Sequence, residues 1–190
     1  YLAPIFMIMG VIIFTMLSTV YSVGRELRYA TSVSWLKRSG GSIGVALCGK
    51  LMPITITMFV LMQMLYLILF VFMGMECAGS YLMLTLVSLC FIIAYQSVAV
   101  LVITLTANLR LALSLAGGYA VMAFTFSGIT FPTMAMFGVA RVLSRCFPMT
   151  YFSEIFISQA MRGAPLKYDI VSMIMLLLFI LMLPISLKRL

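Results

Sequence analysis

Long apolar stretches, separated by charged or turn-forming residues, make up most of the chain. A helix that crosses a membrane needs about 20 mainly apolar residues, and charges mark the ends of such stretches here. The pattern predicts an all-α fold, a polytopic helical membrane protein with one transmembrane domain over 1–190. Its five spans are expected near 1–23, 51–75, 79–106, 111–131 and 170–187.

The amino-acid composition supports the same prediction of a membrane protein. Hydrophobic residues fill 65% of the 190 positions, charged residues only 8%, and the mean hydropathy is +1.24. A soluble domain is about 45–50% apolar and about 25% charged. A water-soluble fold could not hide so much apolar surface, so lipid is the expected solvent for much of the chain.

The distribution of basic residues predicts the orientation of the spans. Alternating crossings place residues 25–50, Arg110 and Lys188–Arg189 on one side, with Glu26 as the acid among them. Basic loops face the cytoplasm, so this side and the C-terminus are predicted to be cytoplasmic. The net charge of +8 therefore indicates span orientation, and binding of nucleic acid is not expected.

Residues 25–38 differ from a span because they are polar and basic. Apolar positions repeat there at helical spacing, and a Ser-Gly-Gly-Ser turn follows at 39–42. We predict a short amphipathic helix at the cytoplasmic interface, with Trp35 at the level of the lipid headgroups. Spacing alone leaves open a helix that merely rests on anionic lipid. Lys50, which follows the turn, is expected to extend toward the headgroups.

Residues 133–162 are too polar for one span and too apolar for an ordinary loop. Pro132 and Pro148 interrupt helices, and charged residues occur between them. Broken helices at membrane depth need shielding by protein or by a watery cavity. The segment is therefore predicted to form short re-entrant helices on the outer side.

Catalytic and metal-binding chemistry is not indicated. The chain contains no histidine, and its four cysteines form no CxxC pair, so neither a zinc site nor an enzyme activity is expected. Residues 44–51 resemble a phosphate-binding loop, but Leu51 stands where Ser or Thr must ligate magnesium. Cys77 and Cys146 share the predicted outer side, and whether they pair stays open.

Polar residues and glycines inside the spans have mainly structural interpretations. Gln63, Gln96 and Ser97 are predicted to bond neighbouring helices. Gly117–Gly118 permits close approach of another helix, or equally a flexible point in gating. The acids lie outside the centres of the spans, which argues against a proton or sodium relay.

Four short motifs carry a resemblance to a known family. Gly24-Arg25-Glu26-Leu27 follows the first predicted span, and Gly49-Lys50-Leu51 opens the second. A Ser-Gly-x-x-Phe-Pro motif lies at 127–132, and Pro148-Met149-Thr150-Tyr151-Phe152 is followed by Arg162-Gly163 before the last span. In this order the chain resembles the type-2 class of ABC exporter permeases. It departs at Phe137, where the family often has proline. By the resemblance, the helix predicted at 25–38 would be the family's cytoplasmic coupling helix, and it departs there in having Glu26 as its sole acid.

The resemblance implies a transport subunit without ATPase activity of its own. It implies a P-loop ATPase partner that carries ATP and Mg²⁺, a second permease copy in a homodimer or heterodimer, and a bacterial inner membrane. The family has six spans, so the chain would be a fragment lacking an N-terminal span and an outer domain. Contact with the ATPase is expected at Arg25, Glu26, Arg28, Tyr29 and Ser32, and an outer gate at Phe131, Pro132, Phe147, Pro148 and Tyr151.

Two other functions remain open from the sequence. A secondary transporter or channel would move its substrate without ATP, with a proton or sodium gradient as the driving force. A non-transporting membrane subunit of a larger complex would keep the fold and move nothing. No feature of the sequence indicates which cargo an exporter would carry.

Overall fold

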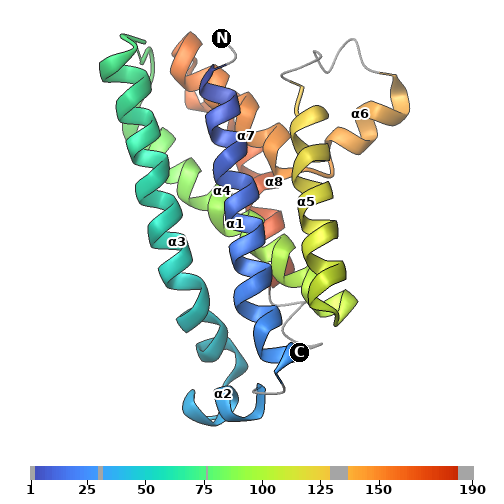
Figure 1. Cartoon of the computed structure of the whole chain (residues 1–190). Coiled ribbons are helices and arrows are strands. Elements are labelled where there is room, and N and C mark those ends of the chain that lie inside the picture. The colour runs from blue at the N-terminus through green and yellow to red at the C-terminus, as the bar shows by residue number, and fades with distance from the viewer. Residues whose placement is uncertain (1–2, 30–31, 76, 129–136, 184–190) are drawn as a thin grey trace.

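The computed structural model describes residues 3–29, 32–75, 77–128 and 137–183 (Figure 1). Within these ranges every regular element is a helix, and turns or short irregular connections join the helices. The predicted all-α class is confirmed for these ranges. Two π-helices, η1 and η3, and a 3-10 helix, η4, interrupt the α-helices. In chain order the elements are α1 (Ala3–Arg28), α2 (Ser32–Arg38), α3 (Ile43–Leu67), η1 (Ile68–Phe72), α4 (Tyr81–Thr106), α5 (Leu109–Thr125), α6 (Gly138–Ser144), α7 (Pro148–Phe156), η3 (Ile157–Arg162), η4 (Leu166–Tyr168) and α8 (Ile170–Ile180).

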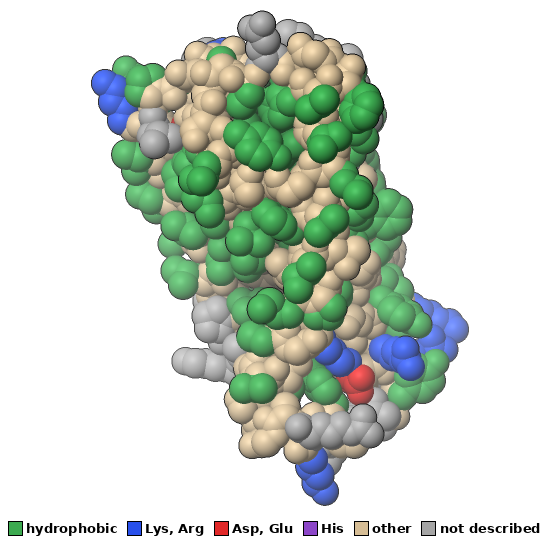
Figure 2. All heavy atoms as spheres, turned by 90° about the vertical axis from the view of Figure 1, so that its left-hand side faces the viewer, with side chains coloured by type: hydrophobic (Ala, Val, Ile, Leu, Met, Phe, Trp, Pro, Cys, Tyr) green, Lys and Arg blue, Asp and Glu red, His purple; other side chains and the backbone are tan. Residues whose placement is uncertain are grey.

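Three stretches of helix are long and apolar enough to cross a membrane: Ile8–Glu26, Ile43–Phe72 and Tyr81–Thr106. They overlap the first three predicted spans, with the first ending after residue 23 and the second beginning before residue 51, and they indicate an integral membrane protein. Two shorter apolar helices, Leu109–Thr125 and Ile170–Ile180, overlap the last two predicted spans. Figure 2 shows hydrophobic side chains over the middle and upper parts of the α3 side, with most Lys and Arg side chains at its lower end.

Helix α4 forms the centre of the bundle and packs against α1, α3, α5, α7 and α8. Its buried polar side chains bond neighbouring helices, as predicted. Gln96 accepts a hydrogen bond from the Thr55 hydroxyl at 2.9 Å, and the Ser97 hydroxyl donates to the carbonyl oxygen of Phe179 at 2.5 Å. These bonds tie α4 to α3 and to α8, where lipid could not satisfy the same groups.

Helices α1 and α5 approach closely because small residues line their contact. Four alanines of α5, at 112, 116, 120 and 123, are completely buried and recur at helical spacing. At Gly24 of α1, an added Cβ would lie 2.7 Å from a Leu109 side-chain atom. No described atom lies within 4 Å of a Cβ built on Gly117 or Gly118. The close approach expected at those two glycines is therefore made by the alanines on another face of α5.

The second predicted span begins earlier than expected, because α3 starts at Ile43 and not near residue 51. The predicted turn at 39–42 is confirmed, with Gly40 and Gly41 at φ values of 67° and 81°, which favour glycine. Helix α3 follows this turn directly and continues through Pro53. The segment 44–51 that resembles a phosphate-binding loop is thus part of a helix.

The predicted coupling helix at 25–38 is divided between two elements. Helix α1 continues to Arg28, and α2 covers only Ser32–Arg38. The first span was expected to end near residue 23, because charges follow it. Those charges instead occupy the last turn of α1, where basic side chains interact favourably with the helix dipole.

Candidate functional site

Two groups of polar side chains lie toward opposite ends of the bundle. The first, which we call the Lys50 junction, consists of Ser22 and Glu26 of α1, Trp35 of α2 and Lys50 of α3. The second is a pocket between α6, α7 and α8. Figure 1 shows α2 at the lower end of the molecule and α6 and α7 in the upper half.

The Lys50 ammonium group makes three contacts that join three helices. It donates to Glu26 Oε1 at 2.6 Å and to the carbonyl oxygen of Ser22 at 2.8 Å, both on α1. It also lies 4.7 Å from the centroid of the Trp35 ring on α2, a cation–π contact. The Lys50 and Glu26 side chains are only 18% and 20% exposed, so water screens their ion pair incompletely.

Lys50 and Trp35 thus have a role that the sequence analysis missed. Both were expected at the lipid headgroups, but each contacts the other. The reason is that α1 and α3 are neighbouring helices joined through a short helix and a turn, which brings the end of one beside the start of the other. The available signal was that Glu26 is the one acid among the basic residues of this region.

The residues expected to contact an ATPase lie around this junction but do not form one cluster. Arg25 and Arg28 are exposed on the last turn of α1, and the Arg28 guanidinium lies 5.8 Å from the centroid of the exposed Tyr29 ring. Glu26 points instead to Lys50. Ser32 is the first residue of α2.

The residues expected at an outer gate fall partly outside the described ranges. Phe131 and Pro132 lie in the undescribed segment 129–136. Phe147 is 3% exposed and lies directly before α7, with its ring centroid 4.9 Å from that of Tyr119 on α5. Pro148 is the first residue of α7, where its missing N–H costs no helical hydrogen bond.

The turn between α6 and α7 has its backbone satisfied by side-chain hydroxyls. The consecutive carbonyl oxygens of Ser144, Arg145 and Cys146 accept hydrogen bonds from Thr150 at 2.6 Å, Tyr151 at 3.0 Å and Tyr119 at 3.0 Å. Such satisfaction is what a non-helical turn requires inside a membrane protein.

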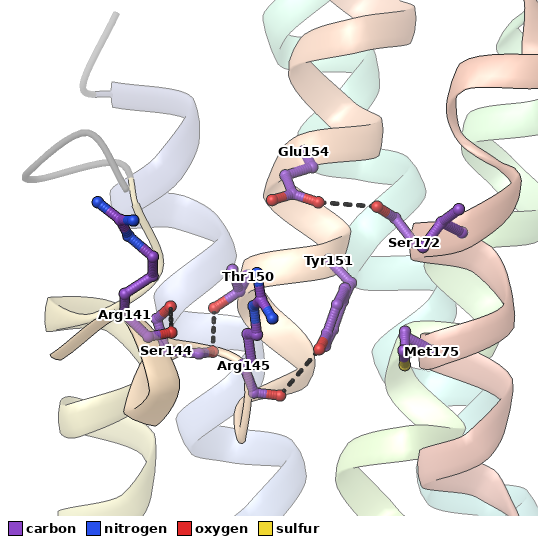
Figure 3. A pocket seen from close by; sticks show the side chains of 9 residues that line it. Arg141, Ser144, Arg145, Thr150, Tyr151, Glu154, Ser172 and Met175 are labelled. Carbon is purple, nitrogen blue, oxygen red and sulfur yellow. Dashed lines mark hydrogen bonds between the residues drawn. The ribbon is translucent and has the colours of Figure 1, made fainter. Parts of the chain in front are cut away.

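The pocket has a volume of about 400 Å³ and contains side chains of both charges (Figure 3). Arg145 lies between α6 and α7, and Arg141 lies one helical turn earlier on α6. Across the pocket Glu154 of α7 accepts a hydrogen bond from the Ser172 hydroxyl of α8 at 2.7 Å. The lining, which we call the α6–α8 pocket, comprises Arg141, Ser144, Arg145, Thr150, Tyr151, Glu154, Val171, Ser172 and Met175.

The described residues include no group of three or more His, Cys, Asp or Glu side chains placed to hold a metal ion. All four cysteines are free, including Cys77 and Cys146. The described side chains form two arrangements: a pocket with charged groups between α6, α7 and α8, and a set of contacts at the Lys50 junction that joins α1, α2 and α3.

Comparison with known proteins identified no relative of the chain. No protein-family model matches the chain, and neither does any curated protein or solved structure. What the protein does is therefore inferred from its own residues and contacts.

Proposed function

We propose that the chain is the permease subunit of an ATP-driven exporter, with the ATPase on a separate partner chain. In this proposal the basic end of the bundle faces the cytoplasm of a bacterium. Five helices cross its inner membrane, two copies pair, and substrate moves outward. ATP and Mg²⁺ bind to the partner chain.

A count of five crossings needs α5 and α8 beside the three longer helices. The 17 residues of α5 give a length of about 25 Å, somewhat less than the roughly 30 Å of a hydrocarbon core. Helix α5 has a completely buried alanine face and packs against α1, which favours a crossing beside α1. Helix α8, described over 11 residues, packs against the central α4 and leaves apolar side chains exposed.

The observation that carries the proposal is the attachment of α2 to two spans at once. Through Trp35 and Lys50, this short helix is bound to α3, and through Lys50 and Glu26 α3 is bound to α1. A partner that moves α2 would therefore move two membrane helices together. Conformational signals are transmitted by packed elements of this kind, which shift between discrete arrangements.

Charge supports the same assignment. Arg25, Arg28 and Lys37 are exposed around α2 and could contact an acidic surface of a soluble partner. The ion pair of Glu26 with Lys50 leaves this end of the molecule with an excess of basic side chains.

The test is purification of the protein from its native membrane in mild detergent, followed by mass spectrometry and an assay of ATP hydrolysis. We expect a P-loop ATPase in an amount equal to that of the chain. The double charge reversal R25E/R28E should reduce the amount of bound ATPase and the ATP hydrolysis of the purified complex. The matched reversal R162E/K167E, at exposed residues outside the α2 region, should leave both unchanged.

Two results would overturn the proposal. The first is absence of any ATPase from protein that remains folded and paired in detergent. The second is substrate transport into vesicles driven by an ion gradient without ATP. Retention of the ATPase by R25E/R28E, with normal hydrolysis, would instead reject contact through these two arginines.

A further inference from the structure

The helix that begins with α7 ends in a turn wider than an α-helical turn. In an α-helix each N–H donates to the carbonyl four residues earlier, which for Ala164 is that of Ala160. Gly163 would likewise donate to Gln159. Here both N–H groups donate instead to the carbonyl oxygen of Ser158, that of Ala164 at 3.1 Å. The π-helix η3 therefore leaves the carbonyl groups of Gln159 and Ala160 without the partners that an α-helix would supply.

A segment distant in the sequence lies against these two carbonyl groups. It consists of Cys77–Gly79, in the connection between η1 and α4, and we call it the strap. The Ala78 N–H donates to the carbonyl oxygen of Ala160 at 3.2 Å. A Cβ added at Gly79 would lie 2.6 Å from the carbonyl oxygen of Gln159, so the two backbones are in direct contact. At Ala160 the strap thus supplies the hydrogen bond that an α-helix would make internally.

Two residues after η3 favour the wide turn over an α-helical one. Gly163 has a φ of 58°, which glycine adopts readily and which an α-helix does not contain. Pro165 has no N–H to donate and disfavours the α conformation of the residue before it. Two hydrogen-bond patterns are therefore available here: a wide turn with the strap in place, and an α-helical turn without it.

Gln159 connects this turn to the start of α8. Its side-chain amide donates to the carbonyl oxygen of Ala164 at 3.1 Å and to Asp169 Oδ2 at 2.6 Å. Gln159 and Asp169 are only 2% and 5% exposed, so water competes little for this contact. A change to the α-helical pattern would rotate Gln159 and alter how α8 is attached.

The strap follows the helix that carries Lys50 near its other end. Helix α3 and η1 form one continuous stretch, Ile43–Phe72, which runs from the lower to the upper end of the molecule in Figure 1. From Lys50 to Phe72 this stretch is about 33 Å long. A displacement of α3 at the Lys50 junction would therefore reach the strap. Coupling over such a distance needs an element with two discrete arrangements, and the turn at η3 is one.

We propose that η3 and the strap form a conformational switch at the end of the bundle opposite the Lys50 junction. With the strap in place, η3 keeps its wide turn and Gln159 holds the start of α8. When the strap leaves, the Ala164 N–H bonds to Ala160, the turn becomes α-helical and α8 is released from Gln159. The switch itself is independent of the exporter proposal, whereas its use in transport rests on that proposal.

The reaction of Cys77 with a maleimide reports on the strap, because this thiol is half-buried while the strap is in place. The protein is labelled in detergent, and mass spectrometry measures the modification of each cysteine, with exposed Cys146 as internal reference. P165A should raise the modification rate of Cys77 about tenfold, since it removes the obstacle to an α-helical turn. P165G removes the same proline but disfavours a helix, so its effect should be roughly fivefold smaller.

A second pair of variants acts on the strap and leaves the helix unchanged. G79A should also raise the modification rate of Cys77, because its methyl group would meet the Gln159 carbonyl. G117A places its methyl group in open space and should leave the rate unchanged. Equal Cys77 modification in wild type, P165A and G79A would overturn the switch. A larger effect of P165G than of P165A would show general loosening of the loop and overturn it as well.

A reversible cross-link tests whether transport uses the switch. The hydrogen bond between Ala78 and Ala160 holds their Cα atoms about 5–6 Å apart, within the range that a disulfide spans. A78C/A160C, with the four native cysteines replaced by serine, is joined by oxidation or by a short cleavable cross-linker. ATP-driven transport should then stop while the ATPase stays bound, and a reductant should restore it. Full transport by the cross-linked protein would reject this use of the switch, whereas absence of ATP-driven transport before cross-linking would reject the exporter proposal.

Discussion

Replacement of Lys50 by methionine tests how firmly α2 is attached to the bundle. The chain has one tryptophan, Trp35, and its ring lies against the Lys50 ammonium group. Tryptophan fluorescence therefore reports on this contact without any added label. Methionine preserves most of the length and apolar character of the lysine stem but removes the ammonium group, with its charge and its hydrogen bonds.

The magnitude follows from the three contacts of Lys50. The cation–π contact with Trp35 contributes about 1 kcal/mol at a partly exposed site. Its loss should raise the population of detached α2 roughly fivefold, since 1.4 kcal/mol is tenfold. The bonds to Glu26 and to the Ser22 carbonyl join α1 to α3, and their loss should lower the free energy of unfolding by about 1–3 kcal/mol.

Two measurements separate these effects. Acrylamide quenching of Trp35 in detergent should increase in K50M, because the detached α2 exposes the ring to water. Unfolding by SDS in mixed micelles should require less denaturant. K50R keeps a cation near the ring and should preserve most of the protection, whereas K37M removes an exposed charge of α2 and should change neither measurement. Equal quenching in wild type and K50M would refute the attachment of α2 through Lys50.

Three further substitutions test the packing that positions the two sites, each by SDS unfolding. G163A should lower stability by about 2 kcal/mol or more, because φ is 58° and the new Cβ would lie 2.6 Å from a backbone oxygen of the connection between η1 and α4. G138A, in open space, should cost nothing, and equal effects of the two would contradict this account. Q159L should cost about 1–3 kcal/mol, since buried Asp169 loses an amide donor at 2.6 Å; a neutral result would contradict that role. Q96L should cost about 0.6 kcal/mol and at most about 1.7, the range of polar contacts between membrane helices.

Regular features of the fold follow directly from the sequence. The apolar stretches locate the first three spans because a helix in lipid needs continuous apolar surface. The turn at 39–42 is equally local, since glycine readily adopts the positive φ that Gly40 and Gly41 show. Helix boundaries are less predictable. Charges were expected to end the first span and delay the second, but Glu26 and Lys50 neutralise each other between the two helices.

The sites depend on contacts between residues distant in the sequence, and these were not predictable from local pattern. Lys50 lies 24 residues from Glu26, and their pairing requires that α1 and α3 be neighbours. The α6–α8 pocket likewise requires α8 to pack against α7. Gly117 and Gly118 show the same difficulty, because glycine permits the close approach of another helix but does not determine which face of its own helix makes the contact.

The two ends of the bundle are held by different kinds of interaction, and this difference bears on how motion could pass through it. At the α6–α7 turn, three uncharged hydroxyls donate to three consecutive carbonyl oxygens, so opening the turn would break several backbone hydrogen bonds at once. Each such loss costs about 1 kcal/mol. At the Lys50 junction, one charged side chain joins three helices and stays partly accessible to water, which can replace each contact that breaks. A partner acting on α2 would therefore rearrange the Lys50 junction first, while the α6–α7 turn keeps its geometry.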